Sequence, residues 1–130
     1  MKRMTLGYLV ALFVLVQIPG PLQAQDSEAD SLRLYADQLT GQAIALWQEG
    51  SFGDIEGLLQ EALRIREQVF GETHLEVSGS LADLGYIYSD LGRWLDAERA
   101  YIRSVAVMEA LVDSEDPRLG SPLNNLALVD

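Results

Sequence analysis

The sequence predicts an all-α fold, an α-solenoid built as an antiparallel helix-pair repeat array with about two and a half repeats. Two observations predict it. Apolar residues recur at spacings of three and four in several segments, which is the period of an amphipathic helix. The chain also repeats itself at a fixed offset of 42 residues, the separation of Gly50 and Gly92. A fixed period of this length is typical of helix pairs that stack to bury their apolar faces.

The 42-residue offset aligns similar residues over most of the chain. Turn, acidic and apolar positions all superpose: Phe52 on Trp94, Asp54 on Asp96, Leu59 on Tyr101, Val77 on Leu119 and Leu84 on Leu126. Because the copies align in both their turns and their apolar faces, we expect each copy to form the same helix pair.

Composition narrows the possible functions. At 130 residues and 48% apolar content, the chain can form one domain or a short repeat array with a core. The net charge of −11 argues against a nucleic-acid surface, which would need clustered Lys and Arg. The absence of cysteine excludes disulfides and thiolate metal sites.

Residues 1–24 have the features of a signal peptide. Two basic residues precede an apolar run, Met4 to Ile18, and the helix breaker Pro19-Gly20-Pro21 follows, with Ala24 at a plausible cleavage point. The alternative is a retained membrane anchor, although the apolar run is shorter than the roughly 20 residues that span a bilayer. We expect an exported chain, periplasmic or secreted, whose residues 25–130 form the repeat array.

Glycine and helix-capping signals separate the expected helices. Gly71 fits the position just past a helix end, where a left-handed backbone is needed. Thr73 and Glu76 have the spacing of a capping box, with Thr73 as the N-cap. We expect helices over residues 26–49, 54–70, 73–91 and 94–112.

The two central helices have clear apolar faces. The first face contains Leu81, Leu84, Tyr88 and Leu91, and Gly85 lies where a partner helix could approach its bare backbone. The second face contains Ala97, Ala100, Tyr101, Ser104, Val105 and Met108.

The last segment, residues 116–130, supplies only the first helix of a third repeat, so the last repeat is truncated after its first helix. Asp116-Pro117 is a helix start signal, and Ser121-Pro122 repeats it. Either the helix begins at the second signal or Pro122 kinks it.

The central segment resembles the tetratricopeptide repeat. Leu81-x2-Leu84-Gly85-x2-Tyr88 and Ala97-x3-Tyr101 match the pattern W-x2-L-G-x2-Y followed by A-x3-F, except at the first aromatic. The 42-residue repeat resembles that of the kinesin-light-chain-like class, which is common in bacterial arrays. In this chain we expect the array to be of an exported type. The resemblance implies a TPR-like, non-enzymatic scaffold for protein–protein interaction, with no cofactor.

The resemblance also implies a partner-binding groove, because the first helices of successive repeats line a concave surface that holds peptides. By position, the groove residues are Thr40, Ile44, Trp47, Ala82, Tyr86, Ser89, Asp90, Asn124 and Asn125. Asn side chains in such a groove can hydrogen-bond an extended peptide backbone through both donor and acceptor atoms. Alternatively, the two asparagines are simply polar residues exposed to solvent on a terminal helix.

No catalytic or metal site is expected. His74 is the single histidine, and a zinc site needs three or four convergent ligands. The scattered carboxylates are explained by solvated helix faces or by an acidic surface that selects a basic partner. Most of six aromatic residues are expected in the core: Trp47, Phe52, Tyr86, Tyr88, Trp94 and Tyr101, with Tyr86 as the exception.

Two alternatives concern the end of the chain. The sequence could be the N-terminal fragment of a longer tetratricopeptide-repeat protein that carries a C-terminal caspase-like peptidase domain. It could also be a structural module that self-associates through its C-terminal helix. Leu123, Leu126 and Ala127 are expected to pack onto residues 94–112, which leaves Leu128 and Val129 uncovered.

Overall fold

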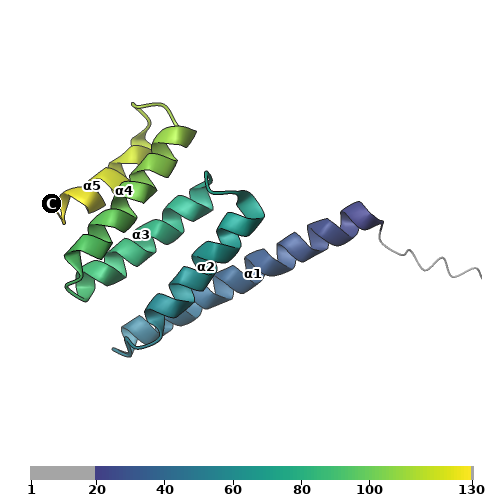
Figure 1. Cartoon of the computed structure of the whole chain (residues 1–130), viewed down its shortest axis with the longest axis horizontal. Helices are drawn as coiled ribbons and strands as arrows, with labels where there is room; N and C mark the ends of the chain where they lie inside the picture. Colours follow the sequence, from purple (N-terminus) through teal and green to yellow (C-terminus); the bar gives the residue numbers. More distant parts are fainter. Residues whose placement is uncertain (1–19, 130) are drawn as a thin grey trace, which may run out of the picture.

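The fold consists of two antiparallel helical hairpins followed by a short C-terminal helical segment (Figure 1). A computed structural model describes residues 20–129, so most of the predicted signal peptide lies outside the described residues. The elements are α1 (Pro21–Gln48), α2 (Ile55–Phe70), α3 (Leu75–Asp90), α4 (Trp94–Leu111), the 3₁₀ helix η1 (Pro117–Leu119) and α5 (Gly120–Ala127). No strand occurs in this range, and the predicted all-α helix-pair array is confirmed.

Neighbouring elements along the chain pack side by side. α1 packs on α2 and α3 packs on α4, while α2 joins the two hairpins by packing on α3. α1 extends far beyond α2 at its N-terminal end, and α5 lies against α4 and α3 at the other end of the molecule (Figure 1). Within the described residues, no helix is long and apolar enough to cross a bilayer.

Glycines end the helices as predicted. Gly50, Gly71 and Gly92 have φ angles of +75°, +83° and +70°, in the left-handed region that other residues rarely adopt. Gly50 and Gly92 therefore make the same reversal in the two hairpins, as the 42-residue offset predicts.

The N-cap of α3 differs from the prediction. His74 is the N-cap instead of Thr73, and its Nδ1 accepts a hydrogen bond of 3.2 Å from the backbone N–H of Glu76. The imidazole stacks on the Phe70 ring with centroids 4.2 Å apart, and this stacking holds it in the capping position. The capping-box prediction for Thr73 is therefore wrong.

The start of α5 combines both predicted signals. Asp116 caps η1 by accepting from the N–H of Arg118 at 2.8 Å, and α5 continues directly from η1. Pro122 is the third residue of α5, in the first turn, where its missing N–H removes no helical hydrogen bond.

The core runs continuously through both hairpins. Within it, Gly85 of α3 packs directly against Tyr101 of α4, so closely that a Cβ at Gly85 would lie 2.5 Å from the Tyr101 ring. The predicted close approach at Gly85 is thus confirmed. A second cluster, between α1 and α2, contains Ala36, Leu39, Ala62 and Ile65.

Two predictions about burial are wrong, one for Leu91 and one for most of the aromatic residues. Leu91 is exposed because α3 ends at Asp90, one residue before it. Of the six aromatic residues, only Tyr88 and Tyr101 are buried and Trp47 is half-buried; Phe52 and Trp94 are exposed beside the interhelical turns.

The C-terminal helix has a different buried face from the one expected. Leu123 and Ala127 are exposed, whereas Leu126 and Val129 pack against the core. The reason is the helical phase set at the start of the segment, since Leu119 and Pro122 are buried and Leu126 and Val129 continue their face. Leu128 is 80% exposed, as expected.

Candidate functional site

A hollow opens between α1 and α3, the first helices of the two hairpins. Its volume of about 170 Å³ is several times that of one water molecule in the liquid, about 30 Å³. Its surface is predominantly apolar, and the buried side chains of Ile55 and Leu59 on α2 form its base. The lining residues are Ala43, Ile44, Trp47, Ile55, Leu59, Asp83, Tyr86 and Ile87.

An aromatic pair bridges the hollow. The rings of Trp47 on α1 and Tyr86 on α3 meet edge to face, with centroids 5.7 Å apart and an interplanar angle of 72°. Trp47 Nε1 also donates a hydrogen bond of 2.7 Å to Asp90 Oδ2. Because this bond crosses from α1 to α3, it fixes the indole at the edge of the hollow. Tyr86 remains 50% exposed, so a large part of its ring is available for contact.

Helical spacing explains why these side chains face the same space. Ile44 and Trp47 are three residues apart on α1. Asp83, Tyr86 and Asp90 follow at i, i+3 and i+7 on α3 and therefore share one face. The hollow thus lies between two helix faces that each carry an aromatic residue.

Asp83 is the carboxylate in the wall of the hollow. Burial against the apolar lining raises the pKa of Asp83, and the nearby positive charge of Arg66 opposes that rise. Among residues 20–129, no side chain donates a hydrogen bond to the Asp83 carboxylate. The Asp83 side chain nevertheless remains exposed to solvent, and it has no direct cationic partner among residues 20–129.

The structure brings together four of the nine predicted groove residues. Ile44, Trp47 and Tyr86 line the hollow, and Asp90 orients Trp47. The other five do not line the hollow: Thr40, Ala82, Ser89, Asn124 and Asn125. Ala82 and Ser89 are half-buried, and the Ser89 hydroxyl donates a hydrogen bond to the Gly85 carbonyl oxygen.

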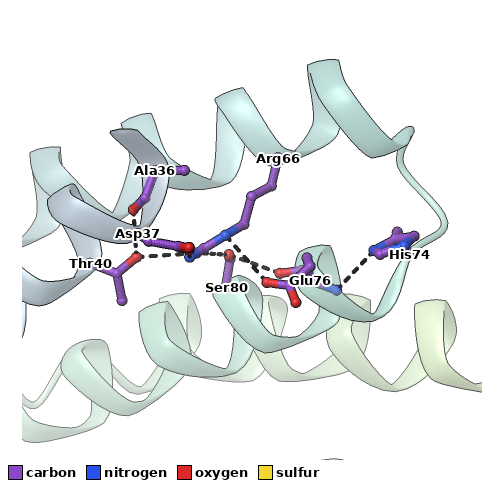
Figure 2. A network of polar contacts seen from close by, with 7 residues as sticks. All are labelled: Ala36, Asp37, Thr40, Arg66, His74, Glu76 and Ser80. Carbon is purple, nitrogen blue, oxygen red and sulfur yellow. Dashed lines mark hydrogen bonds and ion pairs between the residues drawn. The ribbon is translucent and has the colours of Figure 1, made fainter. Parts of the chain in front are cut away.

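Thr40 belongs to a polar network around Arg66, which Figure 2 shows. Arg66 is 7% exposed, and its guanidinium donates to Thr40 Oγ1 at 3.1 Å, Ser80 Oγ at 2.7 Å and Asp37 Oδ1 at 2.7 Å. Glu76 Oε2 lies 3.6 Å from its Nε. A buried guanidinium needs such partners to offset its desolvation. The network therefore joins α1, α2 and α3, and it holds the two walls of the hollow in place.

A stacked group lies beside this network. The Arg33 guanidinium carbon is 4.6 Å from the centroid of the Phe70 ring, on which His74 also stacks. Because His74 Nδ1 accepts the capping hydrogen bond, the imidazole has a structural role at this position. In the described part of the chain, no group of three or more possible metal ligands comes together.

Sequence reasoning missed Asp83. The residue lies three positions before Tyr86 and seven before Asp90, so the helical period alone could have placed it on the predicted face. The contribution of Ile55 and Leu59 from α2 had no such signal, because it depends on how far α1 and α3 are separated.

Comparisons with known proteins agree with this architecture. Residues 35–110 match the family model described as Tetratricopeptide repeat. The crystal structure of BtubC (BKLC) from P. vanneervenii is similar, with a TM-score of 0.69 and 25% sequence identity. The match covers 83% of this chain and 44% of that chain, so the protein spans less than half of BtubC. No curated protein matches the sequence.

Proposed function

The chain belongs to the tetratricopeptide-repeat family, and from this premise we propose that it is a scaffold that binds a peptide or protein partner in the groove between α1 and α3. The observation that carries the proposal is the hollow bridged by Trp47 and Tyr86. The scaffold has no catalytic role in this proposal, and binding requires no cofactor.

The energetics of the hollow favour binding of a side chain from a partner. Ile44 and Tyr86 are each half exposed beside it, although both are large apolar residues. Covering their remaining apolar surface would contribute about 25 cal/mol per Å². Trp and Tyr are also the residues that most often dominate binding energy at protein interfaces.

A peptide selection tests this proposal. We expect peptides selected from a random ten-residue library to lose about tenfold or more in affinity for the Tyr86→Ala variant, since the ring supplies one wall. Phe52→Ala is the matched control, because Phe52 is an aromatic of similar exposure outside the hollow. Equal loss in both variants, or selected peptides that ignore both, would contradict the proposed site.

The 42-residue period supports assignment to the kinesin-light-chain-like class within the family. Duplication of one 42-residue unit would test this class assignment. A chimaera in which residues 50–91 are duplicated should extend the array by one helix pair, and small-angle X-ray scattering should report a longer particle with unchanged helical content. A loss of helical content would argue against the 42-residue unit.

Export is a further part of the proposal, and it rests on the basic start, the apolar run and the breaker within residues 1–24. Intact-mass analysis of protein from the periplasm or medium should show a chain that begins at Gln25 or a near neighbour. Full-length protein in the membrane fraction would instead favour the retained anchor.

Self-association is a second candidate function, which the exposure of Leu123 and of Leu128 at 80% favours. Light scattering coupled to gel filtration should detect an oligomer at tens of micromolar, roughly the range in which exposed apolar surface promotes association. The Leu128→Glu variant should be monomeric under the same conditions. A monomeric parent protein would contradict this second function.

A further inference from the structure

The first and second helices of the hairpins carry similar numbers of carboxylates, but the arginines are concentrated on the second helices. The second helices, α2 and α4, combine acidic residues with four arginines: Arg64, Arg66, Arg99 and Arg103. The first helices carry mainly acidic residues, with Arg33 as their only basic residue: Asp26, Glu28, Asp30, Asp37, Glu76, Asp83 and Asp90. The first helices are therefore more negative than the second helices, and Asp83 is the acidic residue among them that lines the hollow.

Two features of the hollow have the chemistry of a cation site, namely the Asp83 carboxylate and the Trp47–Tyr86 aromatic pair. Asp83 and Asp90 lie on either side of Tyr86 on the same face of α3, and the Trp47 ring meets Tyr86 across the hollow. A guanidinium stacks on aromatic faces and donates planar, paired hydrogen bonds to carboxylates, and the aliphatic stem of arginine is compatible with an apolar lining. A neutral apolar side chain would use the lining but would offer no hydrogen-bond donor to the Asp83 carboxylate, which is exposed at the wall of the hollow.

We propose that the hollow binds an arginine side chain presented by the protein partner, with its guanidinium between the Asp83 carboxylate and the Trp47–Tyr86 pair. This inference rests on the proposed function and specifies the chemistry of the partner at one position. The arginine stem lies along the apolar wall that Ile44 and Ile87 form.

Within residues 20–129, neither Arg66 nor Arg33 donates a hydrogen bond to Asp83. Arg66 is the cation that influences Asp83, yet its donors are directed to Asp37, Thr40 and Ser80. Arg33 lies over Phe70, in the separate stacked group. An incoming guanidinium would therefore supply the direct partner that Asp83 lacks among the described residues, and it would offset the desolvation of that carboxylate.

Nuclear magnetic resonance offers a direct test, because the protein has only two tryptophans. Trp47 lies at the hollow, and Trp94 is exposed at the start of α4. In ¹⁵N-labelled protein, N-acetyl-Gly-Arg-Gly-amide should shift the Trp47 indole N–H signal saturably at concentrations up to about 10 mM, the range of single-side-chain affinities. The Trp94 signal, assigned with a Trp94→Phe variant, should stay in place.

Matched peptides isolate the charge. The citrulline peptide has nearly the same shape as the arginine peptide without the charge, so it should produce a much smaller shift. The lysine peptide should bind more weakly than the arginine peptide, because ammonium lacks the planar stacking surface. Equal shifts with citrulline would overturn the charge recognition, and equal shifts with lysine would overturn the assignment to arginine.

Matched variants locate the charge on the protein. Asp83→Asn should weaken binding of the arginine peptide by about twofold to fivefold, as expected for loss of an exposed ion pair while the cation–π contact beside it is kept. Glu109→Gln removes the same charge from the exposed surface of α4 and should leave the affinity unchanged. Equal weakening in both variants would overturn the role of Asp83.

The outcome of the peptide selection remains separate from this test. Library peptides that need Tyr86 but contain no arginine would overturn the arginine assignment while supporting the proposed groove. Arginine peptides that bind at Trp47, combined with a selection that yields no Tyr86-dependent peptide, would support the cation site and contradict the groove as a peptide-binding surface.

Discussion

The two hairpins use equivalent positions for packing but fill them with different residues. At the 42-residue offset, Ala43 and Leu59 of the α1–α2 hairpin correspond to Gly85 and Tyr101 of the α3–α4 hairpin. All four residues are buried. The second hairpin combines a glycine with a large ring, whereas the first combines a methyl group with a smaller side chain. In the two pairs, the smaller residue on the first helix is therefore matched by the larger residue on the second helix, so that the volumes of the two side chains compensate.

This difference explains where the hollow lies. Ala43 and Leu59 both line it, so the smaller residue at the Tyr101-equivalent position lies where the space opens. A ring at position 59 would extend toward the region that Ala43 and Leu59 now border. The hollow therefore lies where the first hairpin has a smaller core residue than the second at the equivalent position.

A second pair of equivalent positions differs in polarity. Ala36 and Ala62 in the first hairpin correspond to Ser78 and Ser104 in the second, and all four are buried. Ser78 and Ser104 satisfy each other: Ser104 Oγ donates to Ser78 O at 2.9 Å, and Ser78 Oγ lies 2.9 Å from Ser104 Oγ. Two serines at this contact are therefore compatible with burial because each has a partner.

The largest expected effect is at Tyr101. Tyr101→Ala should lower the free energy of unfolding by about 3–5 kcal/mol, the usual scale for truncation of a buried aromatic, because the ring fills the space above Gly85. Urea denaturation followed by circular dichroism measures the loss. Tyr86→Ala, on the exposed face, is the control and should change stability by only about 0.5 kcal/mol. Equal losses would show that the assignment of the two faces is wrong.

Gly85→Ala should destabilise the protein by about 1–3 kcal/mol, because the new Cβ would meet the Tyr101 ring at 2.5 Å. The double variant Gly85→Ala with Tyr101→Leu recreates the residue pair of the first hairpin. Its loss of stability should be smaller than the sum of the two single losses, as a double-mutant cycle would report. Strict additivity would mean that the two hairpins do not share this packing relationship.

Ser78→Ala should reduce the free energy of unfolding by about 0.5–1.5 kcal/mol, the net contribution of a typical hydrogen bond. Replacing both Ser78 and Ser104 with alanine recreates the Ala36–Ala62 contact, so the loss should be less than twice that of one replacement. Thermal unfolding of both single variants and the double variant tests this. A double variant that loses more than the sum would indicate a role beyond the mutual hydrogen bonds.

The smallest expected effect concerns the stability contribution of Asp83. Because burial raises its pKa in the folded protein, the folded state retains the proton longer, and this group lowers stability as pH rises through the interval between the unfolded and folded pKa values. Arg66 on α2 opposes the effect, and the carboxylate in turn helps to raise the pKa of Tyr101 on α4.

Asp83→Asn should therefore be at least as stable as the parent protein at neutral pH, and the difference between them should shrink in acid. Urea midpoints measured across this range test the sign. A variant that is less stable at neutral pH would show that Asp83 supports the fold and would weaken its assignment to the site.

The sequence alone determined the repeat and the positions where helices end. The 42-residue offset and the helical spacing of apolar residues are local features, and a glycine with positive φ ends a helix whatever surrounds it. The helical spacing also placed Gly85 against a neighbouring helix. The resemblance to the tetratricopeptide repeat, carried over by position, suggested Ile44, Trp47, Tyr86 and Asp90 as groove residues, and these four lie at the hollow.

Tertiary structure decided which of the groove residues meet and where a hollow remains. By its position in the repeat, Thr40 was expected at the groove. In the structure, the buried guanidinium of Arg66 needs hydrogen-bond acceptors and donates to the Thr40 hydroxyl. The phase of α5 follows from its continuation of η1, so Leu126 is packed and Leu123 is exposed. The hollow depends on the separation of α1 and α3 and on the volume of Leu59 beneath them. These are properties of packed side chains from distant segments, and no local period encodes them.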